Sequence, residues 1–513
     1  MACGEPFGFA KRSRNSRSRR NLAAMKFTFV ADSKSLISAD HLLVLARASD
    51  FGPRSQLQSK LQKLLDKALA ATAMQLGKEA NVGLLGGSAT SLSGKGKRLT
   101  VGVLPTNVSR HATVTRAESI RKITASAGFG GSAKNAVLIL IDAEDHQVAA
   151  CNAIGRALPD FSMKSRRKTG GSVAIACALH KGTFVKTNAI TKDIVERARE
   201  ASRFVDTPPT DLDPASFATA AKKLLRAVPG IKVTEIVGDA LLKKKLGGIH
   251  AVGRCAKSAP RMLIARANVG KKGKHIALVG KGVTYDTGGL HIKGRGGMET
   301  MKADMGGSAA VLGAFLALAR HHKSSPITLL MCLAENAIGP IAYKPDDVIT
   351  MHSGKTVEIN NTDAEGRLLL ADGCSYAARV LNCDIVLDAA TLTGAQGVAT
   401  GNHFAAVICN DESVEAALCS AGQASGDMVW PLPFAPEFYR SEFASPIADM
   451  RNSVKNRSNA QVSCAAEFIH WNIDGSKAKW GHVDLAYPAF RMNRGTGFGV
   501  ALLFDAVRRL AKR

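Results

Sequence analysis

The sequence predicts an α/β protein of two domains: an N-terminal α/β domain, then a C-terminal α/β domain with a central mixed, largely parallel sheet covered by helices. Three observations predict this class. Short apolar runs alternate with helical stretches along most of the chain, which is typical of strands joined by helices. Thr207 precedes two prolines, which end a helix and disfavour α geometry in the residue before them. The length of 513 residues allows two or three domains with separate cores.

The composition is that of a globular protein and argues against two other classes. Apolar residues make up 46% of the chain and aromatic residues 5%, so base stacking on aromatic side chains is not expected to be widespread. We expect no membrane association, because the best apolar stretch, residues 308–319, is too short to span a bilayer. The ten cysteines form no CxxC pair, which indicates reduced thiols in an intracellular compartment.

The positive charge is concentrated in the N-terminal half. The formal net charge is +27. Residues 1–259 hold 42 Lys+Arg against 19 Asp+Glu, a net charge of +23, so residues 260–513 carry only +4. A basic leader is predicted at residues 1–25, where arginines alternate with serines. This pattern fits a mitochondrial transit segment, a nuclear-import patch or a disordered basic arm, and Met25 as the true start is a further alternative. The expected compartment is cytoplasmic or mitochondrial.

Residues 26–186 are predicted to form the N-terminal α/β domain. Residues 40–81 carry apolar side chains at helical spacing, among them Leu57 and Leu61. A Gly/Ser-rich loop is expected at residues 83–96. The later apolar runs of this domain are predicted strands, at residues 99–104, 136–141 and 173–179.

A linking helix and the Pro-Pro junction occupy residues 187–212, with the helix expected over residues 190–204. Residues 213–513 form the second predicted domain, with helices that include residues 215–225 and 307–319. Its strand-like apolar runs recur between helical segments, at residues 231–236, 262–265, 275–279, 327–333, 385–387 and 404–408. This alternation predicts a sheet with helices on both faces.

Three segments of the second domain concentrate polar residues beside predicted strands, where open α/β sheets bind ligands. In VGKGVTYDTGG (279–289), a strand leads into glycines that let the backbone pass tightly at its end, next to Lys281 and Asp286. Lys293 follows closely. A glycine-rich turn with solvated charges is the alternative; a phosphate loop is a second, but GxxxxGK[ST] is absent.

The other two segments supply carboxylates. MKADMGG (301–307) opens an apolar helix, where Asp304 taken alone better suits an N-cap than a ligand. In NTDAEGRL (361–368), Asp363, Glu365 and Arg367 lie two residues apart, so an extended backbone would point them to one side. Such charges are costly to bury unless they bind something, although a solvated strand edge is the alternative.

Together the three segments indicate a metal cluster. Four carboxylates and a lysine supply hard oxygen ligands and one nitrogen, which suits two divalent ions about 3.5–4 Å apart that share carboxylates. The lysine can bind metal only as the free amine. No HExxH, GxSxG or CxxC motif offers a rival chemistry. The predicted metal-binding residues are Lys281, Asp286, Asp304, Asp363 and Glu365.

At these residues the sequence resembles the cytosolic leucyl aminopeptidase family. NTDAEGRL is similar to the family signature, and the resemblance covers residues 187–500 strongly, with only the general layout before them. It implies a two-metal aminopeptidase that removes N-terminal residues, Leu-like ones preferred, from short peptides. The other matching blocks keep the family's order and spacing: VGKGVTYDTGG, HIK (291–293), MKADMGG, AEN (334–336), SGKTVEI (353–359) and ATLTGA (390–395).

The resemblance implies how the metal ligands divide. Asp286 and Glu365 would bridge both ions. Lys281 and Asp304 would complete the tighter site, and Asp363 would complete the more exchangeable one, which would also bind the α-amine of the substrate. Zinc or manganese are the first candidates for the two divalent ions of each subunit, with cobalt or magnesium as alternatives.

The resemblance also implies two catalytic residues. A water or hydroxide between the ions would be the nucleophile, and Lys293 would hydrogen-bond the developing gem-diolate oxygen. Arg367 would hold a bicarbonate ion as general base, because an arginine stays protonated but its fork can clamp a planar oxyanion. The substrate pocket would be formed by Met301, Thr391, Gly394, Ala486 and Ala489.

Four positions depart from the family pattern. Tyr285 replaces the usual Phe, and Gly294 replaces a Pro after Lys293, so the loop of that lysine is expected to be looser. Asp346 and Tyr487 each replace a usual Gly.

The resemblance implies a homohexamer whose active sites face an inner cavity, and the excess charge leaves one functional alternative open. A nucleic-acid-binding protein on the peptidase fold, as an added or replacement role, would contact DNA non-specifically through the basic N-terminal region. A catalytically inactive scaffold is a second alternative, against which the intact metal and catalytic residues argue.

Overall fold

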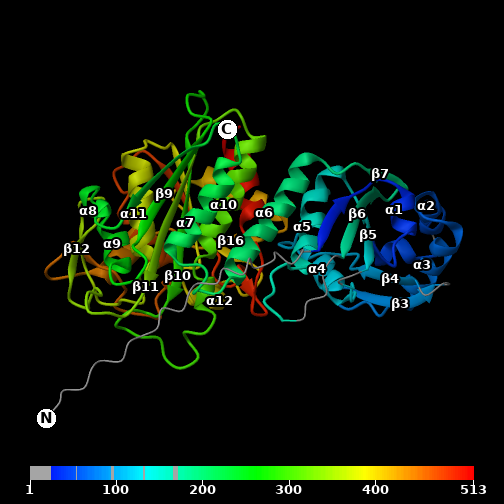
Figure 1. The fold of residues 1–513 in the computed structure, drawn as a ribbon, viewed down its shortest axis with the longest axis horizontal. Coiled ribbons are helices and arrows are strands. Elements are labelled where there is room, and N and C mark those ends of the chain that lie inside the picture. Colours follow the sequence, from blue (N-terminus) through cyan, green and yellow to red (C-terminus); the bar gives the residue numbers. More distant parts are fainter. Residues whose placement is uncertain (1–24, 54, 94–96, 131–132, 166–170, 513) are drawn as a thin grey trace, which may run out of the picture.

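The computed structural model describes residues 25–512 apart from residues 54, 94–96, 131–132 and 166–170. Residues 1–24, nearly all of the predicted basic leader, lie outside this part of the chain. Two α/β units lie side by side along the long axis of the molecule, with α6 (Ala189–Asp206) between them (Figure 1). The predicted class, a two-domain α/β protein, is confirmed.

The N-terminal sheet has seven strands in the order β1-β6-β5-β2-β4-β3, with β7 beside β6. Four of its pairings run parallel, whereas β3 is antiparallel to β4 and β7 is antiparallel to β6. The strands are β1 (Lys26–Phe29), β2 (His41–Arg47), β3 (Gly87–Ser93), β4 (Lys97–Leu104), β5 (Lys134–Ile141), β6 (Ser172–Leu179) and β7 (Thr183–Val185).

Helices cover both faces of this sheet because its strands are apolar on both sides. In β2, Leu42 and Val44 face one core, whereas Leu43 and Leu45 face the other. The first core is completed by α1 (Ser33–Ile37), α2 (Leu57–Leu64) and α3 (Lys67–Glu79). The second is completed by α4 (Ala117–Ser126) and α5 (Gln147–Ala157).

Two expectations for this domain were wrong. Helical spacing over residues 40–81 holds only from α2 onward, because His41–Arg47 is a strand at the centre of the sheet. The Gly/Ser-rich stretch is not a loop throughout, since Gly87–Ser93 forms the edge strand β3. An edge strand needs no buried apolar run on both faces, so its composition resembles that of a loop.

The second sheet has eight strands in the order β16-β15-β18-β14-β10-β11-β9-β8. β18, β14, β10 and β11 are parallel, and antiparallel pairings lie toward both edges. The strands are β8 (Lys232–Val237), β9 (Arg261–Ala267), β10 (Ile276–Asp286), β11 (Ile327–Asn336), β14 (Ile385–Ala390), β15 (Ala405–Cys409), β16 (Val429–Pro431) and β18 (Lys479–Asp484).

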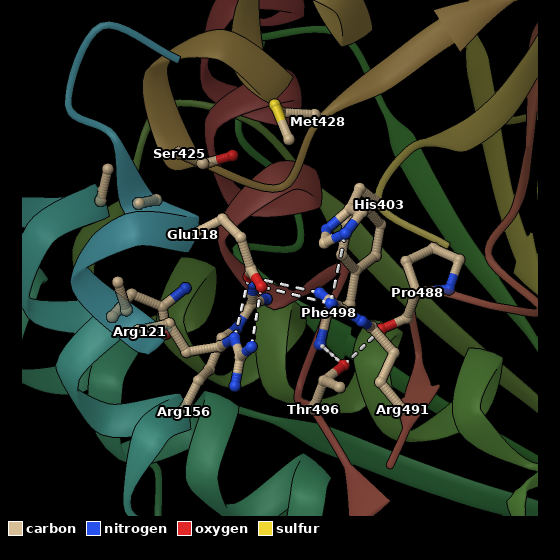
Figure 2. A pocket seen from close by; sticks show the side chains of 15 residues that line it. Glu118, Arg121, Arg156, His403, Ser425, Met428, Pro488, Arg491, Thr496 and Phe498 are labelled. Atoms are coloured by element: carbon tan, nitrogen blue, oxygen red, sulfur yellow. Dashed lines mark hydrogen bonds and ion pairs between the residues drawn. The ribbon is translucent and has the colours of Figure 1, made fainter. Parts of the chain in front are cut away.

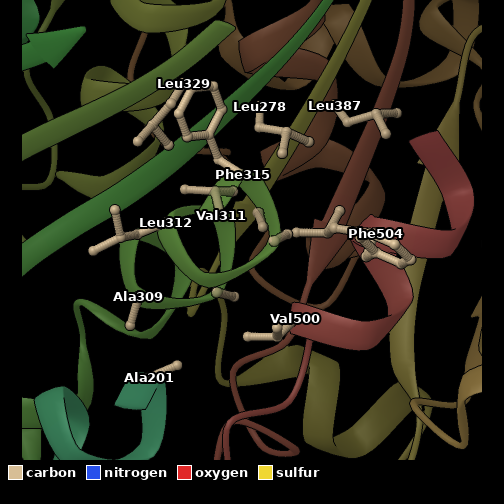
Figure 3. Packing of buried hydrophobic residues seen from close by; sticks show 14 of the residues in the cluster. Ala201, Leu278, Ala309, Val311, Leu312, Phe315, Leu329, Leu387, Val500 and Phe504 are labelled. Atoms are coloured by element: carbon tan, nitrogen blue, oxygen red, sulfur yellow. The ribbon is translucent and has the colours of Figure 1, made fainter. Parts of the chain in front are cut away.

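One face of this sheet packs on α6 and four further helices, α7 (Pro214–Arg226), α10 (Gly306–His321), α13 (Glu412–Ser425) and α16 (Val500–Leu510). Figure 3 shows α10 in this core, with Val311 and Phe315 toward Leu278 and Leu329 of the sheet. The opposite face is covered by α9 (Gly247–Gly253), α11 (Gly366–Arg379) and α15 (Gln461–Trp471).

The remaining elements are short. They are α8 (Ala240–Lys243), α12 (Ala395–Ala399), α14 (Pro436–Tyr439), the small sheet of β12 (Val348–Thr350), β13 (Thr356–Glu358) and β17 (Met450–Arg451), and the hairpin of β19 (Phe490–Arg491) and β20 (Arg494–Gly495). One helical stretch, Met301–His321, is long and apolar enough to cross a membrane, but 89% of its apolar 18-residue window is buried inside the protein, as the core helix α10 requires.

Candidate metal centre and active site

The predicted site residues meet at the carboxyl edge of the second sheet. Lys281 lies within β10, which runs through Gly280 and Gly282 and ends at Asp286. Gly288 and Gly289 have positive φ just beyond that end, where the turn was expected. Asp304 lies just before α10, and its side chain caps no helix, which excludes the N-cap alternative. Because β10 and β14 are parallel, the segments that follow them emerge at the same edge.

The third segment differs from its predicted conformation. Asp363 and Glu365 lie in a turn that leads directly into α11, not in an extended strand. Their carboxylates nevertheless converge with that of Asp286, with one oxygen from each within 4.8 Å of the others. Gly366 leaves room for the side chain of Lys281 beside these carboxylates, because a Cβ on this glycine would lie 2.6 Å from Cε of Lys281.

Lys281 connects two of the carboxylates. Its Nζ lies 2.8 Å from Oδ1 of Asp304 and 3.0 Å from Oε1 of Glu365, and it donates to the carbonyl of Thr391. Burial lowers the pKa of Lys281, but the carboxylates around it outweigh burial and raise the pKa well above its ordinary value. The side chain is therefore an ammonium here, and only a competing cation could convert it into an amine ligand.

Lys293 lies on the other side of the cluster, where it pairs with Asp286 at 2.7 Å and with Asp363 at 2.5 Å. Asp286 also accepts hydrogen bonds from the Gly288 amide and from Asn336. Gly288 has a φ of +86° and a Cβ there would lie 2.9 Å from Oδ1 of Asp363, so the glycine allows the turn to pass this carboxylate.

The residues fit divalent cations on two grounds. Oδ2 of Asp304 and Oε2 of Glu365 are buried and have no hydrogen-bond partner among the described residues, which is unusual for carboxylates unless they hold something. Burial, with the charge of Asp286, raises the pKa of Glu365 to about 8. Burial raises the pKa of Asp304 to about 6 against the effect of Lys281. Cations would stabilise both anions.

Arg367 lies in the first turn of α11 and lines a cavity that Asp363 and Glu365 also line. Burial lowers its pKa to about 10, so the guanidinium stays charged at neutral pH. One Nη donates to the carbonyl of Asn452 at 3.0 Å, while the buried Nε has no partner among the described residues. The guanidinium can therefore still bind a planar oxyanion.

Three supporting residues were not predicted as site residues. Asn336 bridges the Asp286 carboxylate and the Thr362 carbonyl, and its only signal was its place in the AEN block. Tyr343 donates to that same carbonyl. Asn452 accepts from the amides of residues 360 and 361 and donates to the Asn361 carbonyl. Asn452 lies about 90 residues along the chain from these partners, so no local pattern could have revealed it.

The cluster opens into a cavity of about 1080 Å³, which Lys281, Lys293 and Arg367 also line. Of the predicted pocket residues, the lining includes Met301, Thr391, Gly394 and Ala486. Ala489 is buried behind this wall, with its Cβ 3.3 Å from the position of a Cβ on Gly306. The lining also includes residues that were not predicted, among them Val398, Leu432, Tyr487 and Phe490.

The positions that depart from the family pattern have structural consequences. Asp346 has a φ of 72°, a left-handed conformation that glycine adopts without strain. The ring of Tyr487 lies against α12, so closely that a Cβ on Gly397 would be 2.3 Å from it. Gly294 has open space around its Cβ position.

Comparison with known families decides the identity. The model of the cytosol aminopeptidase family catalytic domain matches residues 199–504. The chain belongs to the cytosol aminopeptidase family. A second model, the M17 aminopeptidase N-terminal domain 2, matches residues 52–167. The family membership that the sequence suggested is thereby confirmed, as is an aminopeptidase activity of the leucine aminopeptidase type.

Individual relatives agree with this assignment. The probable aminopeptidase NPEPL1 of Mus musculus is 43% identical over 413 residues, which cover 79% of this chain and 78% of the relative. Leucine aminopeptidase 1 of Caenorhabditis elegans is 42% identical over 401 residues, which cover 78% and 81%. The solved leucyl aminopeptidase of Leishmania major in complex with actinonin matches with a TM-score of 0.85 and 34% identity, over 95% of both chains. The leucyl aminopeptidase of Trypanosoma brucei in complex with bestatin matches with a TM-score of 0.85 and 33% identity, over 95% of this chain and 96% of that one.

Proposed function

We propose that this aminopeptidase is a metalloenzyme that uses two divalent ions to remove N-terminal, preferably Leu-like, residues from short peptides. The observation that carries the proposal is the convergence of Asp286, Asp363 and Glu365 within 4.8 Å, together with buried carboxylate oxygens that have no partner in the described part of the chain. Two related structures hold the peptide-like ligands actinonin and bestatin, which supports a peptide substrate in the cavity.

The proposed ligands are the five residues predicted from the sequence. Asp286 and Glu365 would be shared by both ions, Lys281 and Asp304 would serve the first ion and Asp363 the second. Bound divalent ions supply Lewis acidity toward the scissile carbonyl and make a water nucleophilic at neutral pH. A free α-amine could bind the second ion, whereas a blocked, acylated N-terminus could not, which supports removal of single terminal residues.

Two cationic side chains would act on the reacting groups. The Lys293 ammonium lies at the edge of the cluster and can donate to the oxygen on which negative charge develops. The Arg367 guanidinium can hold a bicarbonate ion, which would accept the proton that the side chain itself cannot accept. Zinc or manganese are the metals proposed first, since both suit mixed oxygen and nitrogen ligands.

A metal add-back assay tests the proposal. The full chain is stripped with a chelator, and hydrolysis of leucyl-p-nitroanilide is followed after addition of zinc, manganese, cobalt or magnesium singly. We expect activity to vanish on stripping and to return with at least one metal, while N-acetyl-leucyl-p-nitroanilide is never cleaved. Full activity in protein shown by elemental analysis to be metal-free, or equal cleavage of the blocked substrate, would overturn it.

A further inference from the structure

Glu118, on α4 of the N-terminal domain, holds two arginines at once. It accepts from Nε and Nη2 of Arg121 at 2.8 and 2.7 Å within its own helix. It also accepts from Nη1 and Nη2 of Arg491, both at 3.2 Å, across to the catalytic domain (Figure 2). Burial alone would raise the pKa of Glu118, but the two arginines outweigh it and lower the pKa to about 2. The carboxylate is therefore charged at neutral pH, and both pairs are bidentate.

Arg491 belongs to a short segment that forms one wall of the active-site cavity. Its neighbour Phe490 lines that cavity, as do Ala486 and Tyr487. The hairpin that contains Arg491 is held on its other strand by Arg494, whose Nη2 lies 2.8 Å from Oδ2 of Asp206. Ser202 and Thr496 hold the same segment through its own backbone carbonyls, whereas Arg491 ties it by a charged side chain to α4 of the N-terminal domain.

Arg491 also reaches the adjoining wall of the cavity. Its Nη2 donates to Nε2 of His403 at 3.4 Å (Figure 2). His403 follows α12, in which Val398 and Ala399 line the cavity. Gln396 of the same helix accepts from the Tyr487 amide at 2.9 Å. One guanidinium thus connects α4 with both walls of the cavity.

The space around Glu118 is too small for a substrate. The cavity that Glu118, Arg121, His403 and Arg491 line has a volume of about 40 Å³, which is room for no more than one or two waters. The cluster is therefore a structural connection between the domains and not a second binding site.

We propose that Glu118 is a positioning residue for the peptidase reaction. Through Arg491 it fixes the wall formed by residues 486–490, and so the N-terminal domain sets how the cavity holds the first side chain of the peptide. The inference rests on the proposed aminopeptidase action in this cavity. The bridge acts on substrate binding and on side-chain preference, because the predicted ligands and Lys293 lie on other elements.

A simpler role would be to hold the two domains together, and a second ion pair already does this. Arg156 of α5 pairs with the buried Asp427 of the catalytic domain. Asp427 accepts from the amides of Gly499 and Leu502 at the start of α16. No residue of this pair lines the large cavity. Loss of this pair would weaken domain contact without moving the cavity wall.

The test compares Glu118→Gln, Arg491→Gln and the double variant in the full-length, metal-loaded enzyme. Arg121→Gln is the matched control, because it also removes a bidentate partner of Glu118 but leaves the cavity wall attached. Steady-state kinetics are measured on leucyl- and phenylalanyl-p-nitroanilide, alongside thermal unfolding. We expect Glu118→Gln and Arg491→Gln each to raise KM by about threefold to tenfold and to change the Leu/Phe preference, with kcat within about twofold.

The pattern of the variants separates the outcomes. The double variant should be no worse than either single one, Glu118→Asp should recover most of the KM, and Arg121→Gln should match the parent. If Glu118→Gln proves unstable, Arg491→Lys keeps the charge without the fork and should show the same shift in preference. An unchanged KM and preference in these variants, or additive losses in the double variant, would overturn the inference. An inactive metal-loaded parent would overturn the proposed function instead.

Discussion

Glu365 is buried beside three other acids, and only one of its two oxygens has a partner among the described residues. Replacement by glutamine keeps the volume and removes the charge that cations would balance. We predict that Glu365→Gln and Asp363→Asn each bind fewer than two ions per chain and lose activity, while the fold persists. Elemental analysis, circular dichroism and the peptidase assay check this.

The exposed Glu437 provides a control for this prediction, since it lies outside the cavity. Glu437→Gln removes the same charge and should leave metal content and turnover unchanged. Two bound ions and normal turnover in the Glu365→Gln enzyme would refute the assignment of its carboxylate as a ligand.

Lys293 and Arg367 should behave differently from the ligands. The ammonium of Lys293 neutralises Asp286 and Asp363, so its removal should not weaken the binding of cations. We predict that Lys293→Ala and Arg367→Ala keep two ions per chain but lower kcat by about 10²–10³, which is typical for loss of one group that stabilises transition-state charge. Lys344→Ala, at an exposed position, is the control.

Bicarbonate distinguishes the two roles. Added bicarbonate should raise kcat of the parent and of Lys293→Ala but not that of Arg367→Ala, because only Arg367 is assigned to hold it. The same response in all three enzymes would remove the base assignment while leaving the metal assignment intact.

At the scale of single residues, the sequence predicted those site members that sit in contiguous polar segments. Lys281, Asp304 and Glu365 could be found because each stands beside glycines or an apolar helix. The residues that orient them could not, because Asn452 acts through backbone groups of a loop far away in sequence. Such contacts arise only when the chain has folded.

The start of α10 is the element whose packing the site depends on most directly. A Cβ on Gly307 would lie 2.1 Å from the carbonyl oxygen of Ala389 at the end of β14. Because this neighbour is backbone, the helix start and the adjacent Asp304 would have to move. We predict that Gly307→Ala lowers the free energy of unfolding by about 1–3 kcal/mol and weakens metal binding, as measured by denaturant unfolding and metal titration.

Gly294 is the control for that prediction. It has no atom within 4 Å of its Cβ position and no left-handed φ, so Gly294→Ala should leave stability unchanged or slightly raised. Equal stability of Gly307→Ala and the parent would show that α10 can shift freely, and the packing argument would fail.

At the scale of elements, most continuous apolar runs were predicted correctly as strands, but the helical spacing expected over residues 40–81 missed β2, which is apolar on both faces. The runs that became β4, β5, β6 and β11 are continuous and apolar. The central strand β18 (Lys479–Asp484) was not predicted, because it contains the polar residues His482 and Asp484. These are buried with partners on neighbouring segments: Nδ1 of His482 lies 2.5 Å from Oδ1 of Asp388, and Asp484 accepts from Thr393. A strand that contains buried polar pairs lacks the apolar pattern by which strands are predicted from sequence.

On the scale of the whole molecule, the net positive charge is concentrated in the N-terminal half of the chain. Residues 32–259 carry 35 Lys+Arg against 18 Asp+Glu, so the excess does not lie only in the leader. The predicted metal cluster lies in the other half of the chain, which is nearly balanced. Peptide hydrolysis therefore does not account for the basic half.

That basic half leads to a prediction for the full chain. Dispersed positive charge with few aromatic residues favours binding of polyanions by counterion release rather than by base recognition. We expect duplexes of unrelated sequence to bind with similar affinity at about 50 mM salt, and roughly 10³-fold more weakly at about 200 mM. Fluorescence anisotropy measures this binding, with heparin as competitor and the peptidase assay run in parallel.

A preference for one DNA sequence that survives at the higher salt would contradict a purely electrostatic contact. Absence of DNA binding at the lower salt would show that the basic residues interact only with solvent. The nucleic-acid-binding role would then be refuted, whereas the peptidase assignment would be unaffected.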